Sequence, residues 1–277
     1  MSIGIVGNGF VGSAVAHGFR NHNPLIYDIH PELSPNTLEE VMSCEYVFIC
    51  LPTPMTKPEG GPCNISILED FLSRVEHNPN QVLIIKSTVP IGTTRRMAEK
   101  YGLSNLVHNP EFLTASNAKE DFVNADRTVI GSPQWDPIFD CGYVESVMAL
   151  FDEQFPTIPI FPMLSDESEL VKYTANCFLA TKVMFFNEIC KLSNSLGIDY
   201  DQVMRGVLSD SRIGKTHTQV PGPDGDYGFG GTCFPKDINA LMRTMKEHQV
   251  DPRILEAVWK DNLSDREDWD WAESESA

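Results

Sequence analysis

Residues 1–12 read Met-Ser-Ile-Gly-Ile-Val-Gly-Asn-Gly-Phe-Val-Gly, and this stretch decides the fold of the first half of the chain. The apolar run Ile3–Val6 predicts a buried strand, and the spacing of Gly12–Arg20 predicts a helix soon after it. A glycine-rich turn between a strand and a helix is typical of dinucleotide-binding domains. The stretch therefore predicts such a domain at the N-terminus.

The turn and the strand after it indicate which dinucleotide binds. Gly7 permits a tight turn, Gly9 lets the backbone approach a pyrophosphate, and Gly12 lets the helix pack closely on the strand. Asp28 ends the next predicted strand, 21 residues after Gly7. Its carboxylate suits the two ribose hydroxyls and would repel a 2′-phosphate, which favours NAD over NADP. The alternative is a glycine-rich turn beside a surface aspartate.

Strands and helices alternate through the first half of the chain. This alternation predicts an α/β fold, a doubly wound parallel Rossmann sheet covered on both faces, in a domain spanning residues 1–163. The predicted strands are Ile3–Val6, Leu25–Tyr27, Tyr46–Leu51, Val82–Lys86, Asn105–His108, Arg127–Ile130 and Thr157–Ile160. The predicted helices of this half include Gly12–Arg20, Ile67–Glu76 and Thr93–Tyr101.

The second half is predicted to be helical. Residues 165–196 contain no Gly or Pro, and Gly197 is a natural stop, so we expect one long helix there. Such a helix needs packing partners, which predicts a helical domain over residues 164–263 and a homodimer built on the helix. Shorter helices are expected at Tyr200–Leu208, Asp237–Glu247 and Pro252–Leu263. The acidic residues 264–277 are expected to form a solvated tail.

Composition narrows the class of partner. The formal net charge is -18, which disfavours nucleic acid and anionic membranes. No apolar run is long enough to span a bilayer, and the N-terminus resembles a strand rather than a signal peptide. The seven cysteines include no Cys-x-x-Cys pair, so we expect free thiols, a cytoplasmic location and no metal site. Lone cysteines are usually small buried apolar residues, which is our expectation for Cys44, Cys50, Cys141, Cys177 and Cys190.

Polar residues stand where the predicted strands end. Ligands of open α/β sheets bind at the C-terminal ends of the strands, so these positions are candidates for the site. Ordinary turn chemistry is the alternative for any one of them. They are Thr53, Ser87, Thr88, Asn109 and Glu111.

Seven motifs in order resemble one family. They are Gly-Asn-Gly-Phe-Val-Gly (7–12), Leu-Pro-Thr-Pro (51–54), Lys-Ser-Thr-Val-Pro-Ile-Gly-Thr (86–93), Asn-Pro-Glu-Phe-Leu (109–113), Asp-Arg-Thr-Val-Ile-Gly (126–131), Glu-Leu-Val-Lys-Tyr-Thr-Ala-Asn (169–176) and Gly-Gly-Thr-Cys-Phe-Pro-Lys-Asp (230–237). Together they resemble the UDP-glucose/GDP-mannose dehydrogenases, from about residue 3 to residue 242. That family oxidises the C6 alcohol of a nucleotide sugar to a carboxylate with two NAD.

The resemblance implies a covalent route and a set of catalytic residues. Cys233 would attack the intermediate aldehyde, and a second hydride transfer would give a thioester that water hydrolyses. Lys172 and Asn176, one helical turn apart, would stabilise the oxyanion. Asp237 would position water or take a proton, and Thr88 would hold the catalytic water. Glu111 would lie near the sugar or serve as general base.

The resemblance also implies two sets of binding residues. The expected cofactor contacts are Gly7, Gly9, Phe10, Val11, Gly12, Asp28, Thr53, Thr88 and Lys236. The expected contacts of the nucleotide sugar, UDP-glucose first, are Glu111, Phe112, Leu113, Lys172, Asn176, Arg212 and Gly230. Arg212 resembles an arginine that reaches the substrate's phosphates, often from the neighbouring subunit.

Three departures from the family pattern bear on function. Ala115 stands where the family commonly has a second glutamate. Only 17 residues separate Asp28 from Tyr46, where the family segment is longer. Only 44 residues follow Cys233, too few for the second Rossmann-like domain that grips the nucleotide in family members.

Two other functions remain open at this point. A two-electron dehydrogenase of the hydroxyacid or phosphogluconate kind also joins a Rossmann domain to a helical domain, and it does not need Cys233. A non-catalytic NAD-binding dimer is the third reading. A Cys233→Ala variant distinguishes the first two, because retained alcohol oxidation with release of a carbonyl compound favours the smaller reaction.

Overall fold

The computed structural model describes residues 1–76, 78–134 and 142–272. Two compact units make up the described chain. The first unit contains residues 1–53 and 65–172, and the second contains residues 54–64 and 173–277 apart from the undescribed end. No described helix is both long enough and apolar enough to cross a membrane.

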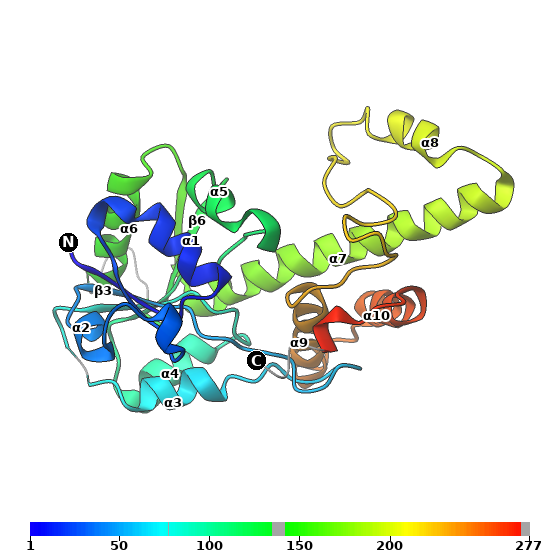
Figure 1. The fold of residues 1–277 in the computed structure, drawn as a ribbon. Helices are drawn as coiled ribbons and strands as arrows, with labels where there is room; N and C mark the ends of the chain where they lie inside the picture. Colours follow the sequence, from blue (N-terminus) through cyan, green and yellow to red (C-terminus); the bar gives the residue numbers. More distant parts are fainter. Residues whose placement is uncertain (77, 135–141, 273–277) are drawn as a thin grey trace. The chain divides into compact units, whose positions relative to one another are not determined.

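The first unit is built on a seven-stranded sheet (Figure 1). Its spatial order is β2 (Leu25–Tyr27), β1 (Ile3–Val6), β3 (Tyr46–Ile49), β4 (Val82–Ile85), β5 (Leu106–His108), β6 (Thr128–Ser132) and β7 (Ile160–Leu164). The first five strands are parallel, as expected. β6 pairs with β5 in the antiparallel sense at His108 and Gly131, and β7 is parallel to β6. The sheet is therefore mostly, rather than wholly, parallel.

Helices cover both faces of this sheet, which confirms the doubly wound α/β class (Figure 1). One face packs on α1 (Phe10–Gly18), α5 (Ala118–Val123) and α6 (Tyr143–Gln154). The other face packs on α2 (Leu38–Met42), α3 (Ser66–Ser73) and α4 (Thr93–Tyr101). Every residue of β1, β3 and β4 is buried, which explains why these strands are continuous apolar runs instead of alternating ones.

The last strand lies further along the chain than the sequence predicts. We expected a strand over Thr157–Ile160, but β7 runs from Ile160 to Leu164 and includes Pro162. β7 is the outermost strand of the sheet. A proline is tolerated there because the outward-facing side of an edge strand has no ladder hydrogen bond to lose.

The long helix has the bounds that the sequence predicts. α7 runs from Ser165 to Leu196, and Gly197 ends it with φ +66°. A positive φ is a conformation that glycine adopts at little cost, so the stop is a local property of the sequence. The residues of α7 up to Lys172 belong to the first unit, and those from Tyr173 onward belong to the second.

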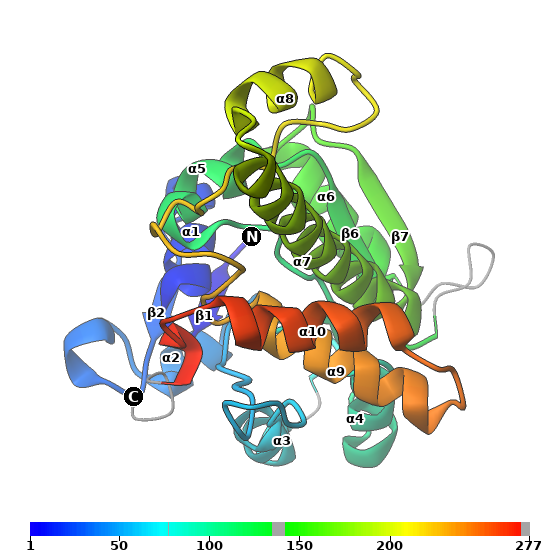
Figure 2. The same cartoon turned by 90° about the vertical axis from the view of Figure 1, so that its right-hand side faces the viewer.

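The second unit is helical and has its own apolar core. Besides α7 it contains α8 (Tyr200–Val207), α9 (Phe234–Glu247) and α10 (Arg253–Asp265). α9 and α10 lie side by side (Figure 2). Apolar side chains of α9 and α10 form one core with the α7 residues Cys177, Ala180 and Met184, and this core includes Trp259.

Over the residues that the structure describes, 264–272, the acidic C-terminal segment packs against the second unit, where a solvated tail was expected over 264–277. Arg266 and Trp271 are buried, and the indole N–H of Trp271 donates to the carbonyl of Pro58 over 2.9 Å. The apolar area of the tryptophans outweighs the acidic character that suggested solvation. The remaining residues, 273–277, lie outside the described part of the chain.

Candidate active site

The glycine turn after β1 has the geometry that a dinucleotide requires. Gly7 has φ +93°, and a Cβ there would lie 2.5 Å from the carbonyl oxygen of Cys50. A Cβ at Gly12 would overlap the carbonyl oxygen of Gly7. A Cβ at Gly9, by contrast, would meet nothing within 4 Å. The loop is thus tightly packed on its inner side and open at Gly9.

The start of α1 presents backbone donors. Gly9 is the N-cap residue and, within the described chain, no side chain caps this helix end. The first N–H groups of a helix have no acceptor within the helix, and the helix dipole is positive at this end. The Asp28 carboxylate accepts the N–H of Asn8 over 2.6 Å and that of His30 over 2.9 Å. Asp28 is therefore fixed beside the turn, at the end of β2.

Hydrogen bonds join the ends of the two neighbouring strands, β3 and β4. The hydroxyl of Thr53 donates to the carbonyl of Thr88 over 2.8 Å, and the hydroxyl of Ser87 donates to the carbonyl of Leu51 over 2.6 Å. β3 lies next to β1 in the sheet. The strand-end residues predicted from sequence are thus brought together along the edge where the glycine turn lies.

Lys86 is a buried cation that the sequence reasoning did not single out. Its ammonium donates to Asn109 Oδ1 over 2.8 Å, and the Asn109 amide donates to the carbonyl of Val129 over 2.6 Å. Burial lowers the pKa of Lys86 to about 8, with a further decrease from Lys172. The available signal was a lysine at the end of an apolar run, Val82–Lys86, where a strand end normally carries an uncharged residue.

Glu111 and Lys172 form a buried ion pair in the first unit. Lys172 Nζ lies 2.8 Å from Glu111 Oε1, and the two side chains are 2% and 4% exposed. Glu111 Oε2 accepts the N–H of Leu113 over 2.7 Å. Burial alone would raise the pKa of Glu111, but the charge and hydrogen bond of Lys172 outweigh it, so the pKa is lowered. Lys172 also lies 5.5 Å from the centre of the Phe112 ring.

Cys233 is the N-cap residue of α9 in the second unit. Its carbonyl accepts the N–H of Asp237 over 2.9 Å, which forms the first turn of the helix. Pro235 stands in that turn, where its missing N–H costs nothing. The half-buried thiol thus occupies the positive end of a helix dipole, an environment that stabilises a thiolate.

Charged and amide side chains surround this helix start. Asn176 donates to Asp237 Oδ2 over 2.6 Å, and the ammonium of Lys236 pairs with Asp237 Oδ1. Burial alone would lower the pKa of Lys236. The Asp237 carboxylate, with smaller contributions from Cys63 and Cys233, reverses this effect and raises it. Lys236 therefore stays charged near Cys233.

Two predicted substrate contacts lie outside these groups. Arg212 has an 88% exposed side chain and pairs with Asp210, two residues before it, through its Nε and Nη2 atoms. Gly230 packs closely against another side chain, since a Cβ there would overlap the guanidinium of Arg266. The remaining predicted residues fall into two groups, Gly7–Lys172 in the first unit and Asn176–Asp237 in the second.

One of the sequence expectations, the burial of the lone cysteines, includes a position that the structure does not describe. Cys141 lies outside the described residues, so the expectation that it is buried stays a prediction. Of the other lone cysteines, Cys44, Cys177 and Cys190 are buried and Cys50 is half-buried. No three His, Cys, Asp or Glu side chains in the described ranges are grouped so as to hold a metal ion.

The fold and the glycine turn define a dinucleotide-binding protein, because the turn lies where the strand order changes direction between β1 and β3. Residues 30–140 match the NAD binding domain of the UDP-glucose/GDP-mannose dehydrogenase family. Residues 166–264 match the central domain of the same family. The chain belongs to the UDP-glucose/GDP-mannose dehydrogenase family.

Individual relatives agree with this assignment. The UDP-glucose 6-dehydrogenase of Rickettsia felis is 31% identical, and the match covers 95% of this chain and 64% of the relative. The solved UDP-glucose dehydrogenase of Pyrobaculum islandicum is 29% identical with a TM-score of 0.77, and the match covers 95% of this chain and 68% of that one. The chain thus spans about two thirds of the length of these relatives.

A second solved structure shares the fold alone. The 3-hydroxyisobutyrate dehydrogenase of Mycobacterium tuberculosis, solved with L-serine, is 16% identical with a TM-score of 0.69. The match covers 100% of this chain and 99% of that one. Because a shared fold does not fix the function, this likeness carries no statement about the reaction.

Proposed function

We propose that this chain oxidises the C6 alcohol of a nucleotide sugar, UDP-glucose first, to the carboxylate with two molecules of NAD. The observation that carries the proposal is the position of Cys233 at the N-terminus of α9, near the buried ammonium of Lys236. A two-electron alcohol dehydrogenase needs no such thiol. In a four-electron oxidation, a nucleophile can hold the aldehyde covalently for the second step.

The first unit fits NAD. The open face at Gly9 and the uncapped start of α1 suit a pyrophosphate, with Phe10, Val11 and Gly12 in the first turn. Asp28, fixed beside the turn, suits the ribose hydroxyls. When bound, NAD accepts the hydride that leaves C6.

The chain's own residues would then handle protons and the covalent intermediate. The Cys233 thiolate adds to the aldehyde carbon and gives the oxyanion of a thiohemiacetal. The C=O bond of this oxyanion re-forms as a second hydride leaves C6 for a second NAD, which gives the thioester. Water then attacks the thioester, which releases the carboxylate and returns the thiol. Lys172 and Asn176 stabilise the oxyanion, a contribution of about 3 kcal/mol per donor.

The remaining roles follow from the hydrogen bonds within each group. Glu111 accepts a hydrogen bond from Lys172 in their buried ion pair, besides serving as substrate contact or general base. Asp237 holds Asn176 and Lys236, and we propose that it also takes the proton from the hydrolytic water. Thr88 is proposed to hold that water. Arg212, exposed in the described chain, is proposed to reach the phosphates of a substrate bound to a neighbouring subunit.

We also propose a homodimer built on α7. Four apolar side chains spaced along one stripe of this helix are exposed in the described chain: Phe178, Phe185, Leu192 and Leu196. The spacing of seven residues from Phe178 to Phe185 and on to Leu192 suits packing against a second helix. Phe185→Glu is expected to give a monomer in light-scattering measurements. Asn194→Glu, on the opposite side of α7, is the matched control.

Stoichiometry tests the reaction. Purified protein is incubated with excess NAD and a limiting amount of each of several nucleotide sugars, and NADH is followed by absorbance. Two NADH per sugar, with a carboxylate product, supports the proposal. One NADH per sugar with a released carbonyl compound supports the two-electron alternative, which the shared fold of the hydroxyisobutyrate enzyme keeps open. No NADH with any sugar, despite measurable NAD binding, supports a non-catalytic dimer.

The compartment is a further part of the proposal. Cys44, Cys50, Cys177 and Cys190 form no disulfide within the described residues. Free thiols are typical of a reducing compartment, so we propose a cytoplasmic location. Fluorescence microscopy of a tagged chain, with fractionation as a second measurement, tests this.

A further inference from the structure

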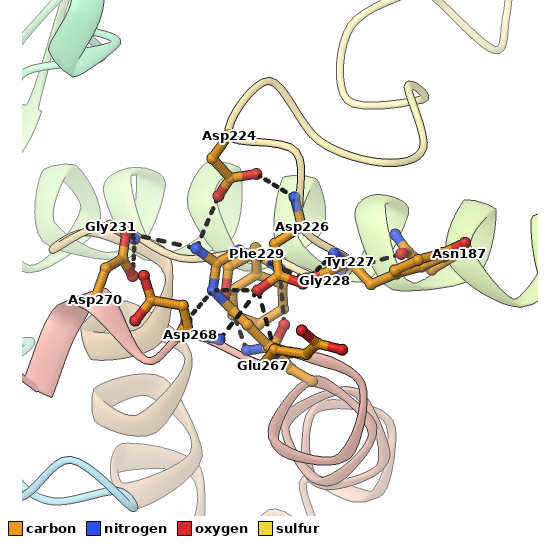
Figure 3. Close-up of polar contacts among 12 residues, drawn as sticks. Asn187, Asp224, Asp226, Tyr227, Gly228, Phe229, Gly231, Glu267, Asp268 and Asp270 are labelled. Atoms are coloured by element: carbon orange, nitrogen blue, oxygen red, sulfur yellow. Dashed lines mark hydrogen bonds and ion pairs between the residues drawn. The ribbon is translucent and has the colours of Figure 1, made fainter.

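Residues 266–271, here termed the C-terminal clamp, pack against the loop that leads to Cys233 (Figure 3). The clamp follows α10 and lies beyond residue 264, where the match to the family's central domain ends. The loop comprises residues 224–231. Both segments belong to the second unit, so their contacts lie within one compact body.

Arg266 is the centre of the clamp. Its side chain is 2% exposed, and its Nη2 atom lies 2.7 Å from Asp224 Oδ2 and 3.5 Å from Asp270 Oδ2. Its Nε donates to the carbonyl of Asp268 over 2.7 Å. A buried guanidinium is tolerated only when its charge and donors are matched, and these acceptors match them. Arg266 thus ties the start of the loop to the end of the clamp.

Carboxylates hold the two backbones together. Asp226 Oδ2 accepts the N–H groups of Glu267 and Asp268, each over 3.1 Å. Asp270 accepts the N–H of Gly231 through both carboxylate oxygens, over 2.9 and 3.0 Å (Figure 3). Hydrogen bonds from a backbone N–H to a carboxylate are stronger than those to a neutral acceptor. The clamp therefore fixes the loop two residues before Cys233.

Two asparagines hold the preceding part of the loop. Asn262 Oδ1 accepts the N–H of Phe229 over 2.7 Å, and its amide donates to the carbonyl of Phe229 over 3.1 Å. Asn187 Oδ1 accepts the N–H of Gly228 over 3.0 Å. The backbone from Gly228 to Gly231 is consequently held by side chains at three of its four residues.

We propose that Arg266 and Asp270 are positioning residues for Cys233. They act by fixing the Gly230–Gly231 backbone, so that the thiol is held in one orientation at the start of α9. The proposal rests on the proposed function, in which Cys233 is the nucleophile. Gly231 has φ +73°. Glycine is the most flexible residue type, because it has no Cβ, so an external tie is needed for a defined thiol position. A displacement of about 1 Å at a reacting atom costs on the order of a hundredfold in rate.

Asp270→Ala tests the proposal, with Asp270→Asn as the graded variant and Asp268→Asn as the matched control. Asp268 is an exposed residue of the clamp, and its hydrogen bonds to Arg266 and Asp226 are made by its backbone. The first readout is the rate at which iodoacetamide alkylates Cys233 in the folded full chain, measured by peptide mass spectrometry. Alkylation of half-buried Cys50 in the same sample is the internal reference.

The two readouts are expected to move in opposite directions. In Asp270→Ala the loosened loop exposes the thiol, so alkylation of Cys233 becomes several-fold faster while that of Cys50 is unchanged. The kcat for NADH production from the nucleotide sugar falls about tenfold, because one charge-assisted hydrogen bond no longer fixes the loop. The KM for NAD stays the same. Asp270→Asn keeps one acceptor oxygen and shows a smaller change in both, and Asp268→Asn shows neither.

Other results would overturn the inference. If Cys233 is alkylated at the wild-type rate in Asp270→Ala and only the melting temperature falls, the clamp merely stabilises the fold. If alkylation changes while kcat does not, the orientation of Cys233 has no bearing on turnover. The alkylation readout does not depend on catalysis, so it separates this proposal from the proposed function. That function fails by a different result, a Cys233→Ala variant that still forms two NADH per sugar.

Discussion

Asn176 donates a 2.6 Å hydrogen bond to Asp237, which joins the middle of α7 to the first turn of α9. The same carboxylate pairs with the buried ammonium of Lys236. Asp237 is completely buried, so both partners depend on it for their hydrogen bonds or charge balance. Its substitution consequently affects the fold and the helix start that carries Cys233.

We expect Asp237→Asn to lower the free energy of unfolding by about 3 kcal/mol, because it leaves the Lys236 ammonium buried without a counter-charge. Urea unfolding followed by circular dichroism measures this. Asp268→Asn, the same change at an exposed position, is expected to unfold at the wild-type urea concentration. Equal stability of the two variants would show that the buried carboxylate is neutral or dispensable.

Lys86 gives a prediction about pH. Its pKa is lowered from 10.5 to about 8 in the folded state, so the folded protein binds fewer protons than the unfolded chain between these values. The cost of burying the charged form is fully present below pH 8 and is relieved as the pH rises toward 10.5. The stability of the wild type minus that of Lys86→Met should therefore rise by up to about 3 kcal/mol over this range.

The control for this measurement is Lys119→Met, at an exposed position of α5. The difference in unfolding free energy between the wild type and Lys119→Met should not vary with pH over the same range. Other groups that titrate there are common to all three proteins and cancel in the differences. If the difference in unfolding free energy between the wild type and Lys86→Met did not change with pH, Lys86 would be charged over the whole range.

The glycine turn gives a pair of contrasting variants. Gly9→Ala adds a methyl group to open space at a φ of -71°, so folding should be unaffected while NAD affinity falls about tenfold. Gly12→Ala forces a methyl group onto the carbonyl of Gly7 and should prevent the wild-type fold. Thermal melting and NAD titration by calorimetry measure both effects. Unchanged NAD affinity in Gly9→Ala would place the pyrophosphate elsewhere.

The ordered C-terminal segment predicts that Trp271 stabilises the second unit. Trp271→Ala removes a buried indole and its hydrogen bond to Pro58, so we expect a loss of about 3–5 kcal/mol in unfolding free energy. Glu267→Ala, at an exposed position in the same segment, is the control. A wild-type melting temperature for Trp271→Ala would restore the interpretation of this segment as a solvated tail.

Local signals predicted much of the fold. The uninterrupted run from Ser165 to Leu196 predicted α7 to the residue, because helix ends depend on nearby Gly and Pro. β1 and β2 were also predicted with the observed bounds, since turn residues delimit short apolar runs. The position of β7 was wrong because only tertiary structure shows that it is an edge strand, where Pro162 is tolerated.

For the site, the sequence indicated which residues are candidates but not which of them contact one another. The Lys172–Glu111 and Asn176–Asp237 pairs join residues 61 positions apart in the sequence, and no local pattern predicts such pairings. Likewise, the tryptophans near the C-terminus signalled burial, yet the acidic composition of 264–277 outweighed them in the sequence reasoning. Arg266 was overlooked for the same reason.

The proposed role of Cys233, to hold the substrate between two oxidations, is tested by the NADH yield of a Cys233→Ala variant. Wild-type protein and the variant are each given a limiting nucleotide sugar and excess NAD, after NAD binding has been shown to be equal in both. We expect two NADH per sugar from the wild type and no carboxylate from the variant. Two NADH per sugar from the variant would contradict it.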